Sequence, residues 1–283
     1  MSVAPLPRIL IEPLVRAALL EDIGRAGDIT TDAIVSAGAR ARMALVARQA
    51  GRVAGLDLAL LAFDLLDPST AAEVQRPDGS AVAAGDAIAI LAGPARGILS
   101  AERVALNFLS HLSGIATSTA SIVDAVRGHR ARVTCTRKTT PGLRAVQKYA
   151  VRVGGGANHR FGLDDAVLIK DNHIAAAGGI ACAVERVRGA VGHLVKVEVE
   201  VDTLVQLDEA LAAGVDAVLL DNMPPEALRE AVATVGGRAI TEASGGITPA
   251  TAPAIAATGV DLMSVGWLTH SITALDIGLD YLD

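Results

Sequence analysis

Aromatic residues are scarce in this chain, and their scarcity limits what it can bind. Phe, Trp and Tyr make up 2% of the 283 residues, which leaves few rings on which the bases of single-stranded nucleic acid could stack. Acidic residues outnumber basic ones by 31 to 25, which gives a formal net charge of −6. Protein surfaces that bind nucleic acid are usually basic, so both observations argue against a nucleic-acid partner.

Long apolar runs and cysteine clusters are also missing. No uncharged apolar stretch reaches the roughly 18 residues that a membrane span needs, so we expect no membrane partner. The N-terminal segment carries Arg8, Glu12 and Arg16, a pattern of neither a signal peptide nor a transit peptide. The two cysteines, Cys135 and Cys182, have no CxxC or zinc-ligand spacing. They favour a reducing compartment, and we expect a cytoplasmic protein.

Lysine is rare as well, and its distribution is uneven. The four lysines (Lys138, Lys148, Lys170 and Lys196) lie within 59 residues of one another, whereas 21 arginines are spread along the chain. The stretch 136–173 holds seven cations against three anions, or +4, in a protein whose net charge is −6. Clustered Arg and Lys are suited to a small polyanion, because carboxylates and phosphates need fixed charged donors.

The second half of the chain alternates short apolar runs with helical patterns. This alternation favours a parallel sheet, and with six runs we expect it to close into an α/β barrel. The predicted strands are 131–136, 165–170, 193–201, 215–220, 238–244 and 260–266. The clearest helices between them are predicted over 203–214, 224–236 and 248–259, each of which ends in glycine.

Each predicted strand ends on a polar residue or a glycine. Active sites of α/β barrels lie at the carboxyl ends of the strands, so we expect a site there. Glycine in the last two loops would let backbone N–H groups approach a phosphate. The strand-end and loop residues are Arg137, Lys138, Lys170, Glu200, Asp221, Ser244, Gly245, Gly246 and Gly266.

The strand 195–201 alternates strictly between valine and charged residues. Its period of two places Lys196, Glu198 and Glu200 on one face, which we expect to point into the barrel. Buried charges must be paired, and Lys196 and Glu198 could simply pair with each other. Glu242, in a later strand, is also open to a purely structural reading.

A helix is predicted directly after the sequence TRKTT. Thr140 is a plausible N-cap and Pro141 would occupy the first helical position. Arg144, Lys148 and Arg152 follow at intervals of four residues. We expect this basic stripe to be mostly a solvated face rather than part of the site.

The N-terminal region has a different pattern from the second half. Helices are predicted over 9–24 and 56–67, with strand-like runs over 42–55 and 71–93. A long helix is then expected to begin at an N-cap on Ser100. We interpret the region as a separate α+β domain that the C-terminal tail could complete.

Specific motifs in this chain resemble the quinolinate phosphoribosyltransferase family. TRKTTPG, the NHR at 158–160 and IKDNH are the most specific of them. The similarity covers nearly the whole chain. The matching segments are 21–33, 101–117, 136–144, 148–174, 198–204, 219–222, 243–247 and 259–271.

The resemblance implies an architecture, a reaction and an assembly. The fold would be an open, atypical α/β barrel over 113–271, preceded by an α/β sandwich domain over 1–112 that 272–283 completes. The reaction would join quinolinate to phosphoribosyl pyrophosphate and release pyrophosphate and carbon dioxide, giving nicotinate mononucleotide for NAD biosynthesis. Magnesium and a homodimer are also implied.

The resemblance also assigns roles to residues. Lys138, Glu200 and Asp221 would be catalytic, and the two acids would lie on the ribose and magnesium side, directly or through water or substrate. The anion site would bind quinolinate and the phosphates through Arg103 (from the adjacent subunit), Arg137, Lys138, His159, Arg160 and Lys170. The 5′-phosphate would lie at Ser244, Gly245, Gly246 and Gly266.

Three other functions remain open from the sequence. A relative could act on another pyridine or on a molybdenum-linked substrate, although the intact motifs favour quinolinate. A barrel aldolase could form a Schiff base on Lys170 or Lys138. A phosphate-binding barrel without catalytic activity is the least favoured, because Glu200 and Asp221 beside so many cations would be costly without a catalytic use.

Overall fold

The computed structural model describes residues 3–282, which form two compact units. The first unit contains the described residues up to 120, 139–155 and those from 268 onward; the second contains 121–138 and 156–267. The sequence analysis placed the division at 112/113, whereas helix α4 (Ala95–Ala125) runs through that point. Among the described residues, no helix combines the length and apolar character that crossing a membrane requires.

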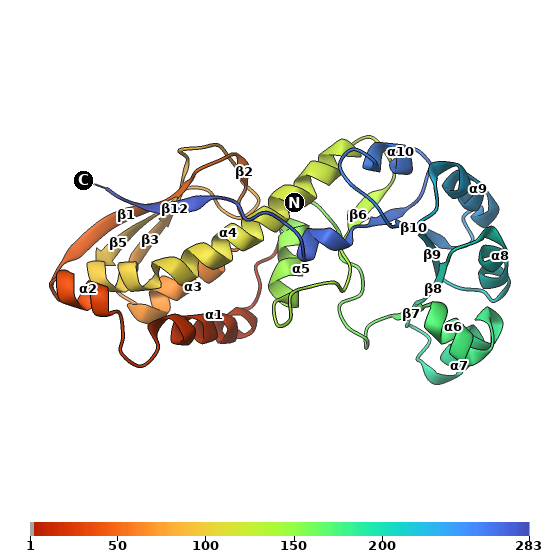
Figure 1. The fold of residues 1–283 in the computed structure, drawn as a ribbon, viewed down its shortest axis with the longest axis horizontal. Helices are drawn as coiled ribbons and strands as arrows, with labels where there is room; N and C mark the ends of the chain where they lie inside the picture. Colours follow the sequence, from red (N-terminus) through yellow and green to blue (C-terminus); the bar gives the residue numbers. More distant parts are fainter. Residues whose placement is uncertain (1–2, 283) are drawn as a thin grey trace. The chain divides into compact units, whose positions relative to one another are not determined.

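The first unit is built on a four-stranded antiparallel sheet. Its order is β12–β1–β5–β3, so the last strand in sequence pairs with the first. In Figure 1 this sheet lies above helices α1, α3 and α4. A two-stranded ribbon of β2 (Gly51–Arg52) and β4 (Ala81–Val82) accompanies it. The strands of the large sheet are β1 (Arg40–Ala47), β3 (Ala71–Val74), β5 (Ala87–Pro94) and β12 (Ile277–Tyr281).

The helices of this unit bury apolar stripes beneath the sheet. Helix α1 (Arg8–Ile23) buries Ile11, Val15 and Leu19 and packs on α3 (Leu56–Leu66). The short α2 (Ile29–Ile34) is capped by Asp28, whose side chain accepts from the Thr31 N–H. Helix α4 begins at Ala95, not at the predicted cap Ser100. The Ser100 hydroxyl lies within the helix and donates to the Asp28 carboxylate at 2.9 Å.

The helix after TRKTT differs from its prediction in start and exposure. Helix α5 (Arg144–Val153) begins after Leu143 rather than at Pro141, since Gly142 has a φ of +80° and forms a turn. Arg152 is exposed as expected, but Lys148 is completely buried. The interpretation of a solvated basic stripe was therefore wrong for Lys148, because α5 packs within the first unit on more than one face.

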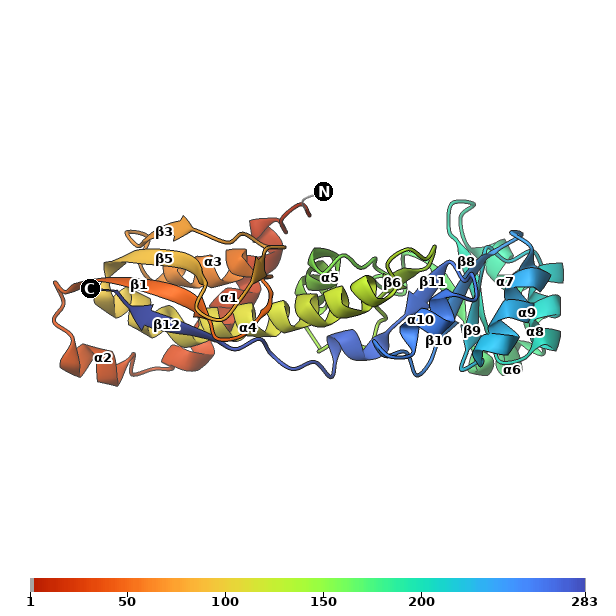
Figure 2. The ribbon, with the colours of Figure 1, turned by 90° about the horizontal axis from the view of Figure 1, so that it is seen from above.

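The second unit contains a six-stranded, wholly parallel sheet. Its order is β6–β11–β10–β9–β8–β7. In Figure 2 helices α7 (Ile180–Ala190), α8 (Leu204–Ala212) and α9 (Pro225–Val235) lie to one side of β8 and β9. No ladder joins β6 to β7 among the described residues, so the barrel is open as the resemblance implied. The strands are β6 (Arg132–Thr134), β7 (Val167–Ile169), β8 (Val197–Val201), β9 (Ala217–Asp221), β10 (Ile240–Ser244) and β11 (Leu262–Ser264).

Helices α6 to α10 lie around the outside of this sheet in Figure 1. Thr203 and Gln206 form a reciprocal capping box that begins α8, and Pro225 opens α9. The predicted helix at 248–259 is shorter, because Thr248 and Thr251 form a turn before it. The helices are α6 (Asp171–Ala177), α7 (Ile180–Ala190), α8 (Leu204–Ala212), α9 (Pro225–Val235) and α10 (Ala252–Ala256).

One glycine allows the C-terminal tail to cross helix α4. A Cβ on Gly114 would collide with the Thr273 carbonyl oxygen and lie 3.0 Å from the Ala274 Cα. We expect overpacking in Gly114→Ala to lower the free energy of unfolding by about 2 kcal/mol. This loss exceeds the gain in helix propensity, which is about 1 kcal/mol.

The matched control is Gly189→Ala near the end of α7, where nothing lies within 4 Å of the added Cβ. It should raise stability by up to about 1 kcal/mol. Urea denaturation measures both variants, and changes of the same sign and size would contradict the crossing argument.

Candidate active site

A pocket of about 390 Å³ lies at the carboxyl ends of the parallel strands. Lys170 follows β7, while Asp221, Ser244 and Ser264 end β9, β10 and β11. The pocket contains eight of the twelve predicted site residues: Arg137, Lys138, His159, Arg160, Lys170, Glu200, Asp221 and Ser244. The structure therefore brings these eight residues together around one pocket of this unit.

Two arginines present unused donors in this pocket. The Nε atoms of Arg137 and Arg160 are buried and have no hydrogen-bond partner among the described residues. One terminal nitrogen of Arg160 donates to the Ala166 carbonyl at 3.0 Å. Burial, and then the nearby Arg137, lower the pKa of Arg160. Buried donors without acceptors are costly, so this arrangement suits an incoming anion.

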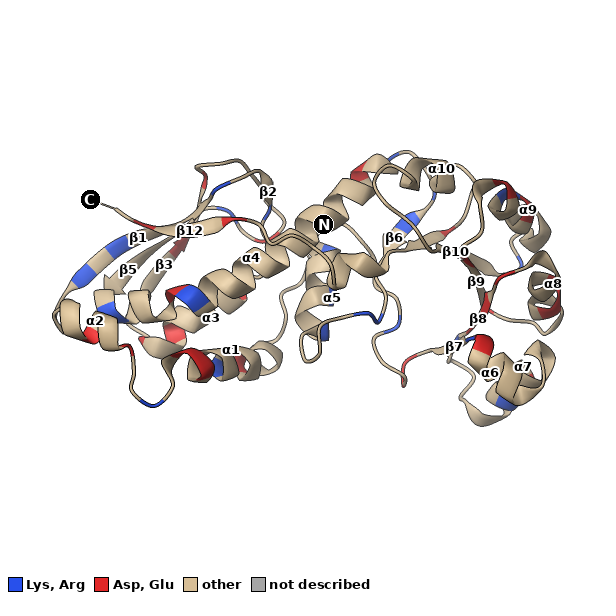
Figure 3. Cartoon of the chain, in the orientation of Figure 1, with Lys and Arg blue, Asp and Glu red and all other residues tan. Residues whose placement is uncertain are grey.

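Acidic residues lie on the middle strands of the sheet, and Figure 3 shows those on β8 and β9 in red. Glu200 accepts a short hydrogen bond from the Lys170 ammonium. Asp221 accepts from the Asn222 side-chain amide at 2.6 Å. A ligand that needs Lys170 must therefore compete with Glu200, or bind where both can reach it.

His159, Glu198 and Glu242 form a largely buried cluster, of which His159 and Glu242 line the pocket. His159 Nε2 is 3.0 Å from Glu198 Oε2 and 3.7 Å from Glu242 Oε1. Glu242 is 1% exposed, and its Oε1 has no hydrogen-bond partner among the described residues. Burial, and then the Glu198 carboxylate, raise the pKa of Glu242 to about 7.

The sequence analysis missed the pairing in this cluster. Lys196 does not pair with Glu198; it is exposed and donates to Asp216 at 2.8 Å. Lys196 precedes β8 and lies near the opposite end of the strand from the pocket, whereas Glu198 points inward with Glu200. The alternating pattern predicted the inward face, but it could not identify His159 as the partner.

The loop after β10 contacts the loops after β9 and β11. Gly245 has a φ of +98°, and a Cβ there would collide with the Asn222 side chain. Trp267 donates its indole N–H to the Ile247 carbonyl at 2.8 Å. Gly266 opens the short 3₁₀ helix η1 (Gly266–Thr269). Gly245, Gly246 and Gly266 are not among the residues that line the pocket.

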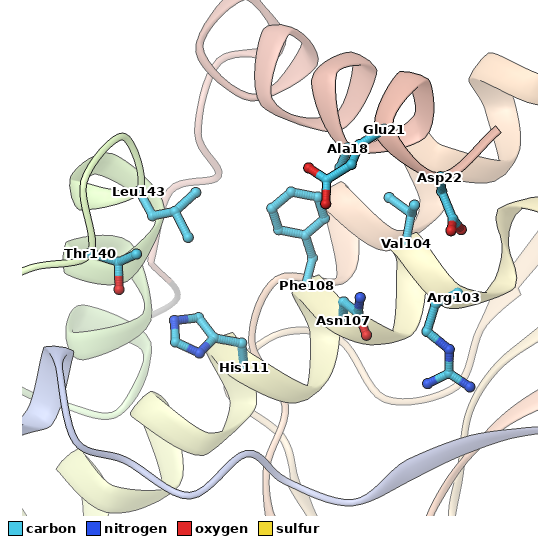
Figure 4. Close-up of a pocket in the computed structure, with 10 residues that line it drawn as sticks. All are labelled: Ala18, Glu21, Asp22, Arg103, Val104, Asn107, Phe108, His111, Thr140 and Leu143. Carbon is cyan, nitrogen blue, oxygen red and sulfur yellow. The ribbon is translucent and has the colours of Figure 1, made fainter. Parts of the chain in front are cut away.

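Arg103 belongs to a different pocket, in the first unit. This pocket of about 250 Å³ lies between α1 and α4 and includes Glu21 and Asp22, as Figure 4 shows. His111 also lines it, and its Nε2 accepts from the Gln147 amide at 2.8 Å. Burial lowers the pKa of His111. The sequence offered no motif by which to single out His111 or Gln147.

The comparisons with known proteins agree throughout the chain. The family models of the N-terminal and C-terminal domains of quinolinate phosphoribosyl transferase match residues 28–113 and 115–280, respectively. A nicotinate-nucleotide pyrophosphorylase (carboxylating) of Mycobacterium leprae (strain TN) is 49% identical over 271 residues, covering 94% of this chain and 95% of its own.

Another similar protein and a solved structure extend this comparison. A probable nicotinate-nucleotide pyrophosphorylase (carboxylating) of Bacillus subtilis (strain 168) is 46% identical over 270 residues, covering 95% of this chain and 93% of its own. The crystal structure of NadC from Streptococcus pyogenes is 44% identical, with a TM-score of 0.94 over 99% of this chain and 100% of that one.

The raised pKa of Glu242 predicts a pH-dependent stability. The folded protein binds this proton more tightly than the unfolded chain does, so stability falls as pH rises from the ordinary glutamate range to about 7. Glu242→Gln removes the ionisation. We expect the stability gained over wild type by Glu242→Gln to be larger at pH 8 than at pH 5 by roughly 3 kcal/mol.

Denaturation at both pH values measures this difference. The matched control is Glu230→Gln, at an exposed position of α9, which should change stability similarly at the two values. A Glu242→Gln difference that does not grow with pH would contradict the assignment.

Proposed function

The chain belongs to the quinolinate phosphoribosyltransferase family, and we propose that the pocket at the strand ends of the second unit is its active site. The reaction transfers the phosphoribosyl group of phosphoribosyl pyrophosphate to the pyridine nitrogen of quinolinate. Pyrophosphate and carbon dioxide leave, and nicotinate mononucleotide is formed for NAD biosynthesis.

The observation that carries this assignment is the pair of buried arginine donors. Quinolinate is a planar dicarboxylate, and guanidinium groups match the geometry of carboxylates. The free Nε–H groups of Arg137 and Arg160 would then find acceptors in the substrate. Lys138 lines the same pocket and would complete the quinolinate side, with His159 beside Arg160.

The phosphoribosyl group would bind toward the last strands. Ser244 ends β10 at the pocket, and the loop of Gly245 and Gly246 follows it. Glycine lets backbone N–H groups approach a phosphate closely, and Gly266 opens the neighbouring loop. We propose this pair of loops for the 5′-phosphate, held together by the hydrogen bond of Trp267 to Ile247.

The acids of the middle strands would act on the sugar. As the pyridine nitrogen attacks and pyrophosphate leaves, positive charge develops at the anomeric carbon. Glu200 and Asp221 lie in the pocket and can stabilise that charge. Lys170 would shift from Glu200 toward the phosphates as they bind, so that neither charge is left unpaired.

Magnesium fits the donor set on this side of the pocket. Glu200 and Asp221 offer hard carboxylate oxygens, and Mg²⁺ is usually held by one or two carboxylates together with substrate phosphates. When bound, the ion neutralises the leaving pyrophosphate. The acids would hold it directly or through water.

Decarboxylation needs little further help from the protein. Ribosylation makes the ring nitrogen cationic, which stabilises the electron pair left at C2 when the adjacent carboxylate departs. We therefore propose that ribosyl transfer precedes loss of carbon dioxide. Rapid carbon dioxide release from quinolinate beside an unreactive phosphoribosyl analogue would contradict this order.

A Schiff-base reaction is not favoured by the geometry. A lysine nucleophile must be a neutral amine, usually in an apolar or cationic environment. Lys170 instead donates to the Glu200 carboxylate, which stabilises its ammonium form. Borohydride trapping with a carbonyl substrate should therefore give no adduct.

A homodimer and a cytoplasmic location complete the proposal. Arg103 lines a pocket of the first unit, and the family resemblance assigns it to the quinolinate site of an adjacent subunit. No disulfide involves Cys135 or Cys182 in the described part of the chain, as is usual in a reducing compartment.

The activity test is synthesis of nicotinate mononucleotide from quinolinate and phosphoribosyl pyrophosphate. We expect activity that depends on magnesium, and losses of about a hundredfold or more in Lys138→Ala and Glu200→Ala, as for lost transition-state charge stabilisation. The control is Lys196→Ala, whose exposed side chain pairs with Asp216 away from the pocket. Full turnover in both site variants would contradict the assignment.

Subunit mixing tests the shared site. Arg103→Ala and Lys138→Ala should each be inactive alone as homodimers. Random mixing makes half of the dimers mixed, each with one intact site, so about a quarter of wild-type activity should return. No recovery after verified exchange of subunits would show that Arg103 acts within its own chain.

A further inference from the structure

The cluster of His159, Glu198 and Glu242 contains more chemistry than the proposed reaction uses. Glu198 lies on β8 and Glu242 on β10, and His159 belongs to the segment that carries Arg160 into the pocket. One side-chain atom from each lies within 4.8 Å of the other two. Such a group could serve as a metal site, as a charged histidine, or as a support for its neighbours.

The hydrogen bonds of the His159 ring distinguish between these roles. The N–H of Arg160 donates to His159 Nδ1 at 2.7 Å, so Nδ1 carries a lone pair and no proton. A neutral ring then has its proton on Nε2, which faces Glu198 Oε2 at 3.0 Å. A metal bound through Nε2 would need the lone pair there. This hydrogen bond therefore opposes a metal at the cluster.

The same bond opposes a charged His159. A second ring proton would sit on Nδ1 and point at the Arg160 N–H, placing two donors against each other. His159 is then a neutral hydrogen-bond bridge and not one of the cations of the pocket. The charge of the cluster comes from its two glutamates alone.

The surroundings of the two carboxyl groups differ. Glu198 accepts from His159 and attracts the Arg160 guanidinium. Glu242 is 1% exposed, with the Ser264 hydroxyl as its neighbour, and its Oε1 has no partner among the described residues. Two adjacent buried carboxylates do not both ionise at modest cost. Glu242, the more deeply buried of the two and without a described donor at Oε1, is therefore the neutral acid.

We propose that Glu198 and, as a neutral carboxylic acid, Glu242 are positioning residues that hold the His159 ring with its proton on Nε2. The ring in turn fixes the backbone N–H of Arg160, and hence the guanidinium that would bind quinolinate. The identity of that ligand rests on the proposed function.

The first test reads the ring directly and needs no substrate. In full-length protein with ¹⁵N-labelled histidine, the His159 signals are those that disappear in His159→Gln. At pH 6 and pH 7 we expect an unprotonated Nδ1 and a protonated Nε2. A ring protonated at both nitrogens, or at Nδ1 only, would overturn the proposal whether or not the enzyme makes nicotinate mononucleotide.

The second test compares two substitutions of Glu242. Glutamine keeps a neutral polar group of the same shape, whereas alanine leaves a cavity and removes the support. We expect the KM for quinolinate to rise by at least about tenfold in Glu242→Ala, a loss typical of a broken buried polar contact, and to be rescued in Glu242→Gln. The KM for phosphoribosyl pyrophosphate should change less.

Thermal denaturation must first show that both variants are folded. If folded Glu242→Gln is as impaired as Glu242→Ala, an ionised Glu242 is required and the proposal fails. Stoichiometric Zn²⁺ binding to the magnesium-loaded wild type that Glu242→Gln abolishes would likewise overturn it. Failure of the wild type to make nicotinate mononucleotide would instead refute the proposed function, and the ring measurement would still stand.

Discussion

The second unit depends on the pairing of charges that lie partly out of water. Lys170 pairs with Glu200, and the His159 ring hydrogen-bonds to Glu198. Each contact limits the cost of burial, which is several kcal/mol for an isolated ion. The buried Nε donors of Arg137 and Arg160 have no such partner among the described residues, and a dicarboxylate would offer acceptors to both.

The sequence was most informative where a physical pattern repeats. Strict alternation in 195–201 predicted both the strand and the inward face of Glu198 and Glu200, because side chains on a strand alternate with a period of two. The other five strands were predicted from short apolar runs between helical patterns, and each run overlaps an observed strand. The order of the sheet, and the gap between β6 and β7, depend on pairings between distant segments, and only the family resemblance anticipated an open barrel.

Partners of individual side chains could not be predicted in the same way. Lys196 pairs with Asp216, which directly precedes strand β9. His159 hydrogen-bonds to Glu198, which lies 39 residues further along the sequence. Lys148 was misjudged because helical spacing reveals a shared face but not whether that face is covered. The start of α5 was missed because the turn at Gly142 competes with the capping signal of Thr140.

The open edge of the sheet explains how the charges are separated. Lysine and arginine follow β6 and β7, the two edge strands, whereas Glu200, Asp221 and Glu242 lie on the three strands between β7 and β11. Ala157, just before His159 and Arg160, forms a parallel bridge with Thr134 of β6. The basic segment therefore lies along an edge that closure of the barrel would occupy with another strand. Since neighbouring opposite charges neutralise each other, separation by strand leaves the arginines available to an anion, and only at the border of β7 and β8 do Lys170 and Glu200 meet.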